Sequence, residues 1–430
     1  MATIPVLHAR RLPVELFGLV ALHLLPPEPF ACSTDDFLTP EYRTRSNTLR
    51  DLAYTCRQLY RALEPLLHRF VVLRNGRQIV SLFMLLADRP HKREHVRHLI
   101  CNTAAYWESN LEGVREVWED RYGRHVRLEH VFHDAGFQVL DHEMDRITYE
   151  EPEILDPTFR CDDSLNFAFG AVLVMLGQVE TLSIHREVTK SGSMELVGLM
   201  LRFLGRRYQL FQKLRTLKIT TEENNWEFGD VLKHFLQHIT TYDVPQTLIV
   251  SGAQSDLINC LNFFTHFRGT TMPQLRTLRV RSWLTPPELR RAPVVPNVMN
   301  VRVLDSLPAF FRGLQELDVE FVRPPHTGHE LWAGVDTWLR GSLEVLRLRC
   351  QRFPHEVLRG RSLGRLRLLA VELCVDVVSR PQSEDVLRIL AAGMEGDEFK
   401  HRALRHVELN GSRFLLDMRI FGLPVVTQLE

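Results

Sequence analysis

Two groups of histidines stand at spacings that could hold a metal ion on one side of a helix. Residues three or four apart on a helix share a face, which suits a tetrahedral site such as that of zinc. The His-Glu-x-x-His arrangement of zinc hydrolases is absent, and arginine or other polar residues surround both groups. We therefore expect surface histidines and no metal. The two groups are His91, His95 and His98, and Glu129, His130 and His133.

Motifs for nucleotide chemistry are also missing. No Gly-x-Gly-x-x-Gly or Gly-Lys-Ser/Thr run is present to cradle a phosphate. Cys56 has no base partner near it in the sequence, and it shares a helix face with Leu52 and Leu59. A small, buried apolar role suits this cysteine better than nucleophilic attack. These observations predict that the protein is not an enzyme and has no cofactor.

The elements that carry these residues begin with a short apolar helix. Pro13 suits a first helical turn, because its fixed φ fits the helix and its missing N–H is not needed there. Apolar residues then recur at Leu16, Leu19, Val20 and the pair at 23–24, on one helical face. A helix should therefore start at Pro13.

A second helix is predicted after the proline-rich and polar stretch 26–47, which we expect to be a loop. Apolar residues keep the spacing of one helical face, and Pro65 stops the helix or begins another turn. Two short amphipathic helices cannot bury both of their faces alone, so they need a partner surface. The second pattern consists of Leu49, Leu52, Ala53, Cys56, Leu59, Tyr60 and Leu63.

These segments together resemble the F-box, and the run 49–69 is similar to F-box proteins of filamentous fungi. The likeness is carried by Leu-Pro-Val-Glu-Leu at 12–16, by Leu-x-x-Leu-Ala-x-x-Cys-Arg at 49–57 and by Pro-Leu-Leu-His-Arg at 65–69. The alternative is a plain helical cap on a larger domain. The resemblance implies an F-box over 10–75 that binds a Skp-family linker protein. The linker-binding residues would be Leu12, Pro13, Leu16, Leu19, Val20, Leu49, Leu52, Cys56 and Leu59.

Short strand-like runs of the form apolar-x-x-Leu-x-apolar recur along the rest of the chain. They return at intervals of 23 to 39 residues, which is the period of a solenoid. Helical segments with capping residues lie between several of them, for example after Ser255 and after Ser383. The runs begin at Val179, Leu214, Pro245, Leu275, Leu314, Leu343, Leu366 and, with Val407 in place of the leucine, Leu404.

Strand followed by helix, repeated, resembles the leucine-rich repeat over about residues 165 to 412. A doubly wound α/β domain is the alternative, and the recurring Leu-x-x-Leu spacing favours the repeat. The expected fold is an α+β or α/β solenoid, in which an all-α F-box precedes an irregular repeat horseshoe. Val96–Leu99 is a candidate for an atypical first strand. The expected divisions after the F-box are a linker region at 76–165 with an acidic loop at 141–163, the repeats at 166–412 and a C-terminal cap or tail at 413–430.

The residues between the core positions of a repeat strand should point to the concave side of the horseshoe. This places an acidic strand between two arginine-bearing strands, and since neighbouring strands lie about 4.8 Å apart, Asp318 should pair with Arg279 or Arg347. Either these charges only neutralise one another, or the arginines grip an acidic or phosphorylated segment. The candidate target-binding residues are Lys218, Arg279, Arg281, Asp318, Arg347 and Arg349.

Length and composition set the outer limits. A chain of 430 residues exceeds what one core usually organises, so two units, or one unit and a repeat array, are expected. Basic and acidic residues number 53 each, so the net charge favours neither nucleic acid nor an anionic membrane. Seven scattered cysteines without a Cys-x-x-Cys pair, and no apolar signal or membrane-spanning stretch, predict a cytoplasmic or nuclear protein.

The two resemblances together imply a non-catalytic receptor. The F-box would dock onto the Skp-family linker, and through it onto cullin and RING subunits, while the repeats hold a target protein for ubiquitin transfer. Tethering of this kind works by raising an effective concentration. The expected function is the substrate-recognition adaptor of a Skp–cullin–F-box ubiquitin ligase, in ubiquitin-dependent degradation. The alternative is a leucine-rich-repeat scaffold or interaction protein without a ligase role.

Overall fold

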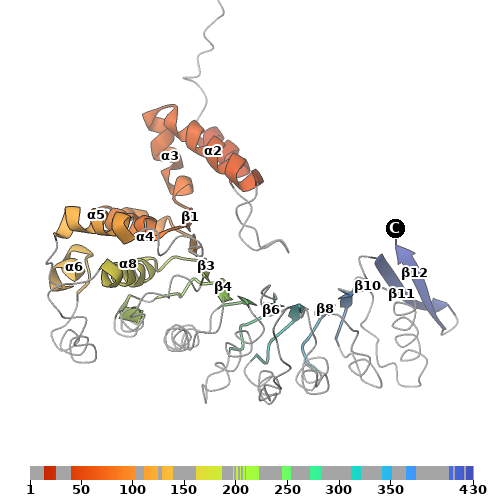
Figure 1. The fold of residues 1–430 in the computed structure, drawn as a ribbon. Helices are drawn as coiled ribbons and strands as arrows, with labels where there is room; N and C mark the ends of the chain where they lie inside the picture. Colours follow the sequence, from red (N-terminus) through yellow and green to blue (C-terminus); the bar gives the residue numbers. More distant parts are fainter. Residues whose placement is uncertain are drawn as a thin grey trace, which may run out of the picture.

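A computed structural model gives the fold of the chain (Figure 1). The residues that it does not describe include Leu12, Pro13, the stretch 26–39 and the stretch 139–160, which holds most of the acidic stretch 141–163. The predictions made for them stay predictions. The described residues are 14–25, 40–101, 111–123, 128–138, 161–185, 197, 200, 201, 204, 207, 208, 210–221, 245–252, 272–282, 311–320, 341–350, 365–373, 406–409, 412–420 and 423–429.

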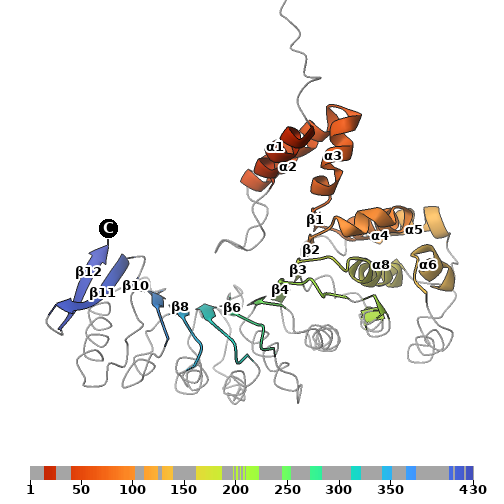
Figure 2. The same ribbon diagram turned by 180° about the vertical axis from the view of Figure 1, so that it is seen from behind.

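Three helices form a small unit at the start of the described chain (Figures 1 and 2). They are α1 (Val14–Leu24), α2 (Pro40–Tyr54) and α3 (Arg57–Leu67), and we call them the three-helix unit. The unit has its own small hydrophobic core, to which each helix contributes. This core consists of Ala21, Leu49, Ala53 and Leu63.

The predicted second helix is in fact two helices. The helix α2 begins at Pro40, inside the stretch that was expected to be a loop, and ends at Tyr54. Cys56 then has an extended backbone, with φ −159° and ψ 159°, and its sulfur accepts a hydrogen bond from the Leu59 N–H at 3.5 Å, which caps α3. Cys56 is therefore exposed, and the prediction of a buried apolar role was wrong. Pro65 lies in the last turn of α3 rather than ending the helix before it.

One long sheet forms the rest of the described structure, and its strands lie in sequence order. The first ten strands pair in parallel, each with the next, and an antiparallel hairpin closes the end. The strands are β1 (Phe70–Leu73), β2 (His98–Cys101), β3 (Thr181–His185), β4 (Thr216–Thr221), β5 (Thr247–Gly252), β6 (Thr277–Ser282), β7 (Glu316–Glu320), β8 (Val345–Cys350), β9 (Leu368–Leu373), β10 (His406–Leu409), β11 (Ser412–Ile420) and β12 (Leu423–Leu429).

This strand order has the α/β character expected from the sequence and is compatible with a solenoid-like fold. In a doubly wound sheet the strand order reverses at a switch point, and here it does not reverse. Each of the eight predicted runs overlaps one strand, from β3 to β10. Figures 1 and 2 show the strands along an arc, with the three-helix unit on the concave side of that arc.

The sheet begins earlier in the chain than the repeat pattern predicted. The strand β1 lies inside the range expected for the F-box, and β2 lies in the expected linker region, where it overlaps the candidate strand 96–99. The residues at 96–101, Val-Arg-His-Leu-Ile-Cys, do fit the form apolar-x-x-Leu-x-apolar, whereas β1 has Val71 at the position of the leucine, so the pattern did not detect β1. Only two residues, His68 and Arg69, therefore separate the end of α3 from the start of the sheet.

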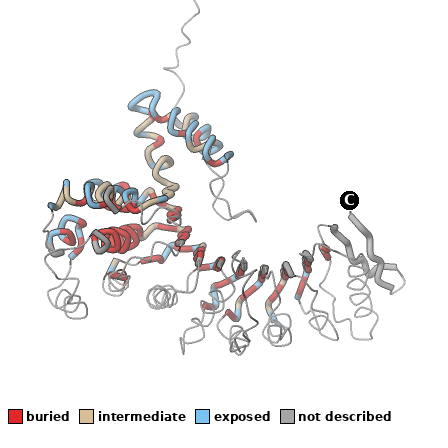
Figure 3. The backbone as a smooth tube through the Cα atoms, in the orientation of Figure 1, coloured by how far each residue is buried: buried red, intermediate tan, exposed pale blue. Residues whose placement is uncertain are grey.

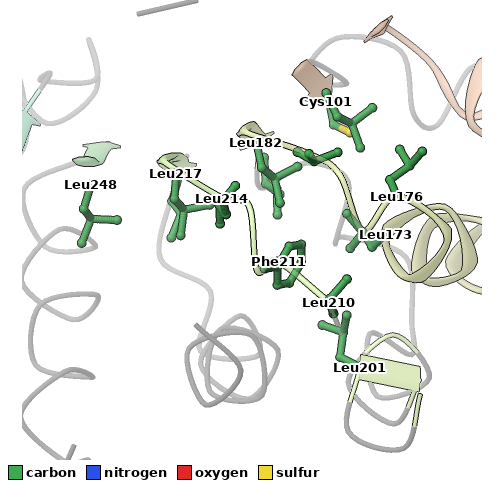
Figure 4. Packing of buried hydrophobic residues seen from close by; sticks show 14 of the residues in the cluster. Cys101, Leu173, Leu176, Leu182, Leu201, Leu210, Phe211, Leu214, Leu217 and Leu248 are labelled. Atoms are coloured by element: carbon green, nitrogen blue, oxygen red, sulfur yellow. The ribbon is translucent and has the colours of Figure 1, made fainter. Parts of the chain in front are cut away.

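The hydrophobic core lies against the convex face of this sheet. Alternate residues of each parallel strand, such as Leu182 and Ile184 in β3, point into it and are almost completely buried. In Figure 4, Leu182 and Cys101 pack close to Leu173 and Leu176 from the end of a covering helix. Val197, Met200, Leu201 and Leu204 are also buried, at helical spacing.

Four helices pack beside β1 to β3 at one end of the sheet: α4 (Gly76–Asp88), α5 (Leu111–Tyr122), α6 (Leu128–Asp134) and α8 (Cys161–Met175). From Ser164 to Met175 every residue of α8 is buried (Figure 3). A short 3₁₀ helix, η2 (Pro90–Glu94), follows α4. No helix within the described ranges is long and apolar enough to cross a membrane.

Candidate functional site

The helix α1 presents an apolar surface that the three-helix unit does not cover. Ala21 is its one fully buried residue among positions 16–25, while the large apolar side chains beside it are 44 to 57% exposed. Because almost every position of α1 is apolar, packing one face on α2 and α3 leaves apolar side chains on the others. We call this the α1 surface, and it consists of Leu16, Leu19, Val20 and Leu22.

Apolar side chains that gather on a surface in this way usually mark an interface with another protein. Of the predicted linker-binding residues, Leu16, Leu19 and Val20 belong to the α1 surface. Leu49 and Leu59 are buried inside the three-helix unit, so their contribution is to its stability. Leu52 packs partly buried against the same core, Cys56 caps α3, and Leu12 and Pro13 lie outside the described residues.

An exposed aromatic residue lies at the end of α2, and the sequence pattern did not single it out. Tyr54 is 67% exposed and stacks on Tyr60 of α3, with 6.1 Å between ring centroids and 7° between ring planes. In the sequence, Tyr54 could have been noticed as a large aromatic residue two positions before Cys56, which caps α3. Because Tyr54 does not follow the apolar spacing of its helix, it was not counted among the interface residues.

The concave face of the sheet carries the second candidate surface, a row of charged side chains on β6, β7 and β8. The strand register places Arg279 beside Asp318, and Asp318 beside Arg347. The next aligned position carries Arg281, Glu320 and Arg349. The predicted order of an acidic strand between two arginine-bearing strands is therefore confirmed.

The ion pairs within this row differ from the predicted ones. Glu316, and not Asp318, bridges the two outer strands: its Oε1 lies 3.6 Å from Nη2 of Arg279 and also contacts Nη1 of Arg347. Long arginine side chains reach the diagonal neighbour two residues along the partner strand, which is within range on a sheet surface. The Arg347 side chain remains 40% exposed, against 17% for that of Arg279. Arg347 is therefore the more accessible of these two arginines.

Asp318 lies in the middle of this row and is only partly accessible. Its burial raises the pKa of the carboxyl group above the ordinary value, and the nearby Arg281, Arg279 and Arg347 oppose that rise. The arginines therefore hold a partly desolvated carboxylate between them. Such a carboxylate costs free energy unless cations stay close to it.

Towards β3, β4 and β5 the concave face is closed to solvent. Lys218 is 8% exposed, and in the strand register it lies between Ser183 and Ile249, which are also buried. Lys218 was predicted to bind a target; its side chain is buried in this structure, and its role in binding stays a prediction. Ile249 and Ser251 of β5 are buried on the same face, and the candidate target-binding residues did not include them.

The histidine groups do not form a metal site. His98 belongs to β2 rather than to a helix, so it is buried, at 2% exposure, and it stacks on Phe70 with 4.4 Å between ring centroids. The prediction that it lies on the surface was wrong. His130 and His133 are exposed on or beside α6 as predicted. Among the described residues, no three His, Cys, Asp or Glu side chains gather as metal ligands would.

One further sequence motif has an unsuitable context. Residues 360–364 read Gly-Arg-Ser-Leu-Gly, the Gly-x-Ser-x-Gly pattern that presents a nucleophilic serine between a strand and a helix. These residues lie outside the described ranges, but the chain enters the strand β9 at Leu368, shortly after the motif. A strand on the C-terminal side does not fit the strand-to-helix turn that the pattern requires.

The described residues thus offer two surfaces for macromolecular contact: the apolar α1 surface and the charged row on β6 to β8. The three-helix unit carries the first, and the sheet carries the second. Comparison with models of protein families, with curated proteins and with solved structures finds no match for this chain.

Proposed function

We propose that this chain is the substrate-recognition adaptor of a Skp–cullin–F-box ubiquitin ligase. The observation that carries the proposal is the α1 surface, where four large apolar side chains stay exposed on a helix whose own unit buries only Ala21. That helix belongs to the segments whose sequence resembles the F-box. A Skp-family linker protein would cover this surface.

The mechanism needs no bond chemistry from this chain. The three-helix unit would bind the linker, and through it the cullin and RING subunits, while the sheet holds the target protein. A target lysine then meets the ubiquitin thioester as a tethered group, which raises its effective concentration. In this role the protein acts in the cytoplasm or the nucleus.

The charged row is the proposed target-binding surface. Arg347 is exposed enough to reach a partner, and a guanidinium group can bind a carboxylate or phosphate through two parallel hydrogen bonds. Glu316 already contacts Arg347 and Arg279. An acidic or phosphorylated segment would therefore have to displace Glu316, which favours a strongly charged ligand over a weakly charged one.

Replacing Leu16 and Leu19 by Ala tests the linker-binding surface. Both side chains lie on the α1 surface and outside the unit's own core, so the double variant should lose the linker in a pull-down with a purified Skp-family protein while keeping its helix content. Exposed Arg43 of α2 and Arg61 of α3 give the matched control, and an Arg43→Ala, Arg61→Ala variant should still bind.

Equal linker capture by the Leu16, Leu19 variant and the unchanged protein would contradict the assignment. If the unchanged protein does not capture the linker, the alternative function is favoured: an interaction scaffold without a ligase role. Affinity purification of the whole chain with the proteasome blocked would then identify the bound proteins in either case.

A further inference from the structure

The three-helix unit and the sheet have separate hydrophobic cores. Within the described residues, the core of the three-helix unit shares no member with the larger core against the sheet. The chain crosses from one unit to the other at His68 and Arg69, between the end of α3 and the start of β1. Apolar packing therefore does not by itself fix how α3 stands on the sheet.

A buried lysine lies at this crossing. Lys92 belongs to η2, on the sheet side, and its side chain is 3% exposed. Its Nζ lies 2.9 Å from Oε1 of Glu64 and 2.8 Å from Nε2 of His68, and these two residues are one helical turn apart at the end of α3. Lysine is almost never buried to this extent unless its charge is paired. We call this contact the Lys92 latch.

The chemistry of the three groups suits a firm contact. An ammonium group donates up to three hydrogen bonds, and here it has a carboxylate and a ring nitrogen as acceptors. Burial and the nearby Lys92 lower the pKa of His68 to about 4, so its ring is neutral near pH 7 and Nε2 is able to accept. The hydrogen bond from Lys92 also lowers the pKa of Glu64 below its ordinary value.

The backbone contacts at the crossing hold β1 but not α3. The N–H groups of Arg97 and His98 both donate to the Arg69 carbonyl at 3.0 Å, and β1 pairs with β2 from Phe70 onward. These bonds anchor the chain from Arg69 forward. The residues of α3 that contact Lys92 precede Arg69 in the chain. This contact, and not the backbone bonds, therefore holds the angle between α3 and the sheet.

We propose that Lys92 is a positioning residue that fixes the angle of the three-helix unit on the sheet. The latch is polar and lies between two separate cores, so breaking it should release the angle without unfolding either unit. Its consequence for a ligase rests on the proposed function: a linker on the α1 surface would be held at a constant distance from a target on the charged row. The variants Lys92→Met and Glu64→Ala each remove one side of the latch.

The test is a distance measurement on the whole chain. Dyes placed through unnatural amino acids at Asn47 of α2 and Glu116 of α5, both exposed, report the distance between the two units by single-molecule energy transfer. With Lys92→Met the distance distribution should broaden and its mean should shift, while the thermal unfolding transition of the sheet is retained. Glu64→Ala should give the same change in the distance distribution. This second variant replaces Lys92→Met in the test if Lys92→Met does not fold.

A control breaks a comparable ion pair inside one unit. Arg121 of α5 lies 2.8 Å from Oδ1 of Asp88 and 2.6 Å from Oδ2 of Asp134, all within the helices that cover the sheet. Arg121→Met should leave the distance between the units unchanged. If folded Lys92→Met or folded Glu64→Ala gives the distribution of the unchanged protein, the latch does not set the angle and the proposal is overturned.

The distance measurement needs no linker protein, so its outcome is independent of the proposed function. A second measurement joins the two. In a reconstituted ligase, Lys92→Met should bind linker and target as the unchanged protein does but transfer ubiquitin more slowly. If the unchanged protein does not bind the linker, only the ligase role is contradicted. If the distance between the units stays the same in Lys92→Met, only the role of the latch is contradicted.

Discussion

His98 is a buried base on β2, aligned in the sheet with Phe70 of β1 and Thr181 of β3. Its ring stacks on Phe70, and burial, together with the charges of Arg69 and Arg97, lowers its pKa to about 4. His68 is half-buried beside Lys92, and burial and that ammonium lower its pKa to about 4 as well. Both rings are therefore neutral in the folded protein over a pH range in which an unfolded chain would protonate them.

Stability should consequently fall as the pH drops from about 6.5 to about 4. In this window the unfolded chain binds more protons than the folded one, so the free energy of unfolding decreases on acidification, by at most about 1.4 kcal/mol per pH unit and group. The contribution of His68 is smaller because solvent screens it. Urea unfolding at several pH values measures the slope.

His98→Leu should flatten that slope, whatever it does to stability at pH 7, because it removes one of the two titrating rings. His130→Gln is the matched control, since His130 is exposed on α6, and it should leave the slope unchanged. An identical slope in the His98 variant and the unchanged protein would show that His98 is not held neutral by the fold.

The strand repeats stack through the backbone as well as through leucine side chains. Before most parallel strands, two consecutive N–H groups donate to one carbonyl of the preceding repeat, as Gln315 and Glu316 do to Arg276 at 2.8 and 2.9 Å. This bonding keeps the strands in one register along the sheet. It also brings the turn before β7 against the turn before β6, where Gly313 lies next to Pro273.

Gly313→Ala should destabilise the sheet. A Cβ atom at this position would lie 2.3 Å from the backbone oxygen of Pro273, and a carbonyl of a neighbouring repeat cannot move aside as the end of a flexible side chain can. Overpacking of this kind typically costs about 1 to 3 kcal/mol. Thermal and urea unfolding measure the loss, which should appear as a lower midpoint.

Gly177→Ala is the control for this substitution. Its added Cβ would lie 3.6 Å from the nearest heavy atom, the backbone oxygen of Tyr208, which is an ordinary contact distance. The two variants make the same chemical change, so the difference between them isolates the clash. Equal midpoints for Gly313→Ala and Gly177→Ala would mean that the repeats can shift apart at little cost.

At the scale of the whole molecule, two surfaces of different chemistry belong to two units that meet at the Lys92 latch. The α1 surface is apolar, and the row on β6 to β8 is charged, so they suit different partners. In the proposed adaptor role, this separation would let one chain bind two proteins at once. The proposed adaptor role requires that either surface can be disabled without affecting the other.

Reversing the charge of Arg347 and Arg349 should release the target and leave linker binding intact. Arg347→Glu places a carboxylate beside Glu316 and Asp318, which would repel an acidic or phosphorylated ligand. Capture of target from cells with the proteasome blocked is the measurement for the double variant Arg347→Glu, Arg349→Glu. Recovery of the linker in the same experiment shows that the three-helix unit is intact.

Arg367→Glu is the control for the charge reversal. Its side chain is 70% exposed just before β9, outside the charged row, and its contact with Glu344 is long, at 3.8 Å. This variant should capture the target as the unchanged protein does. Target capture that survives the double reversal would place recognition elsewhere on the molecule, and the charged row would then serve only to neutralise its own strand β7.

Local sequence was sufficient for features that depend on local spacing. The leucines of β3 to β10 recur in each strand because every repeat buries the same face, so the eight strands and the order of arginine and acidic strands could be predicted from the sequence. The apolar positions of α1 likewise predicted a helix, and the structure leaves several of its apolar side chains exposed; that a partner covers them stays a prediction. In each case, neighbours along the chain carry the whole signal.

Contacts between distant segments decided the rest. Cys56 follows the end of α2 and caps α3, β1 joins the sheet with Val71 where β2 has Leu99, and His98 is buried against Phe70 of β1. The arginines pair with Glu316 rather than Asp318 because their reach depends on side-chain direction across strands. Lys92 looked like one basic residue among several, and only the tertiary structure buries it against α3, 24 residues away from His68 in the chain.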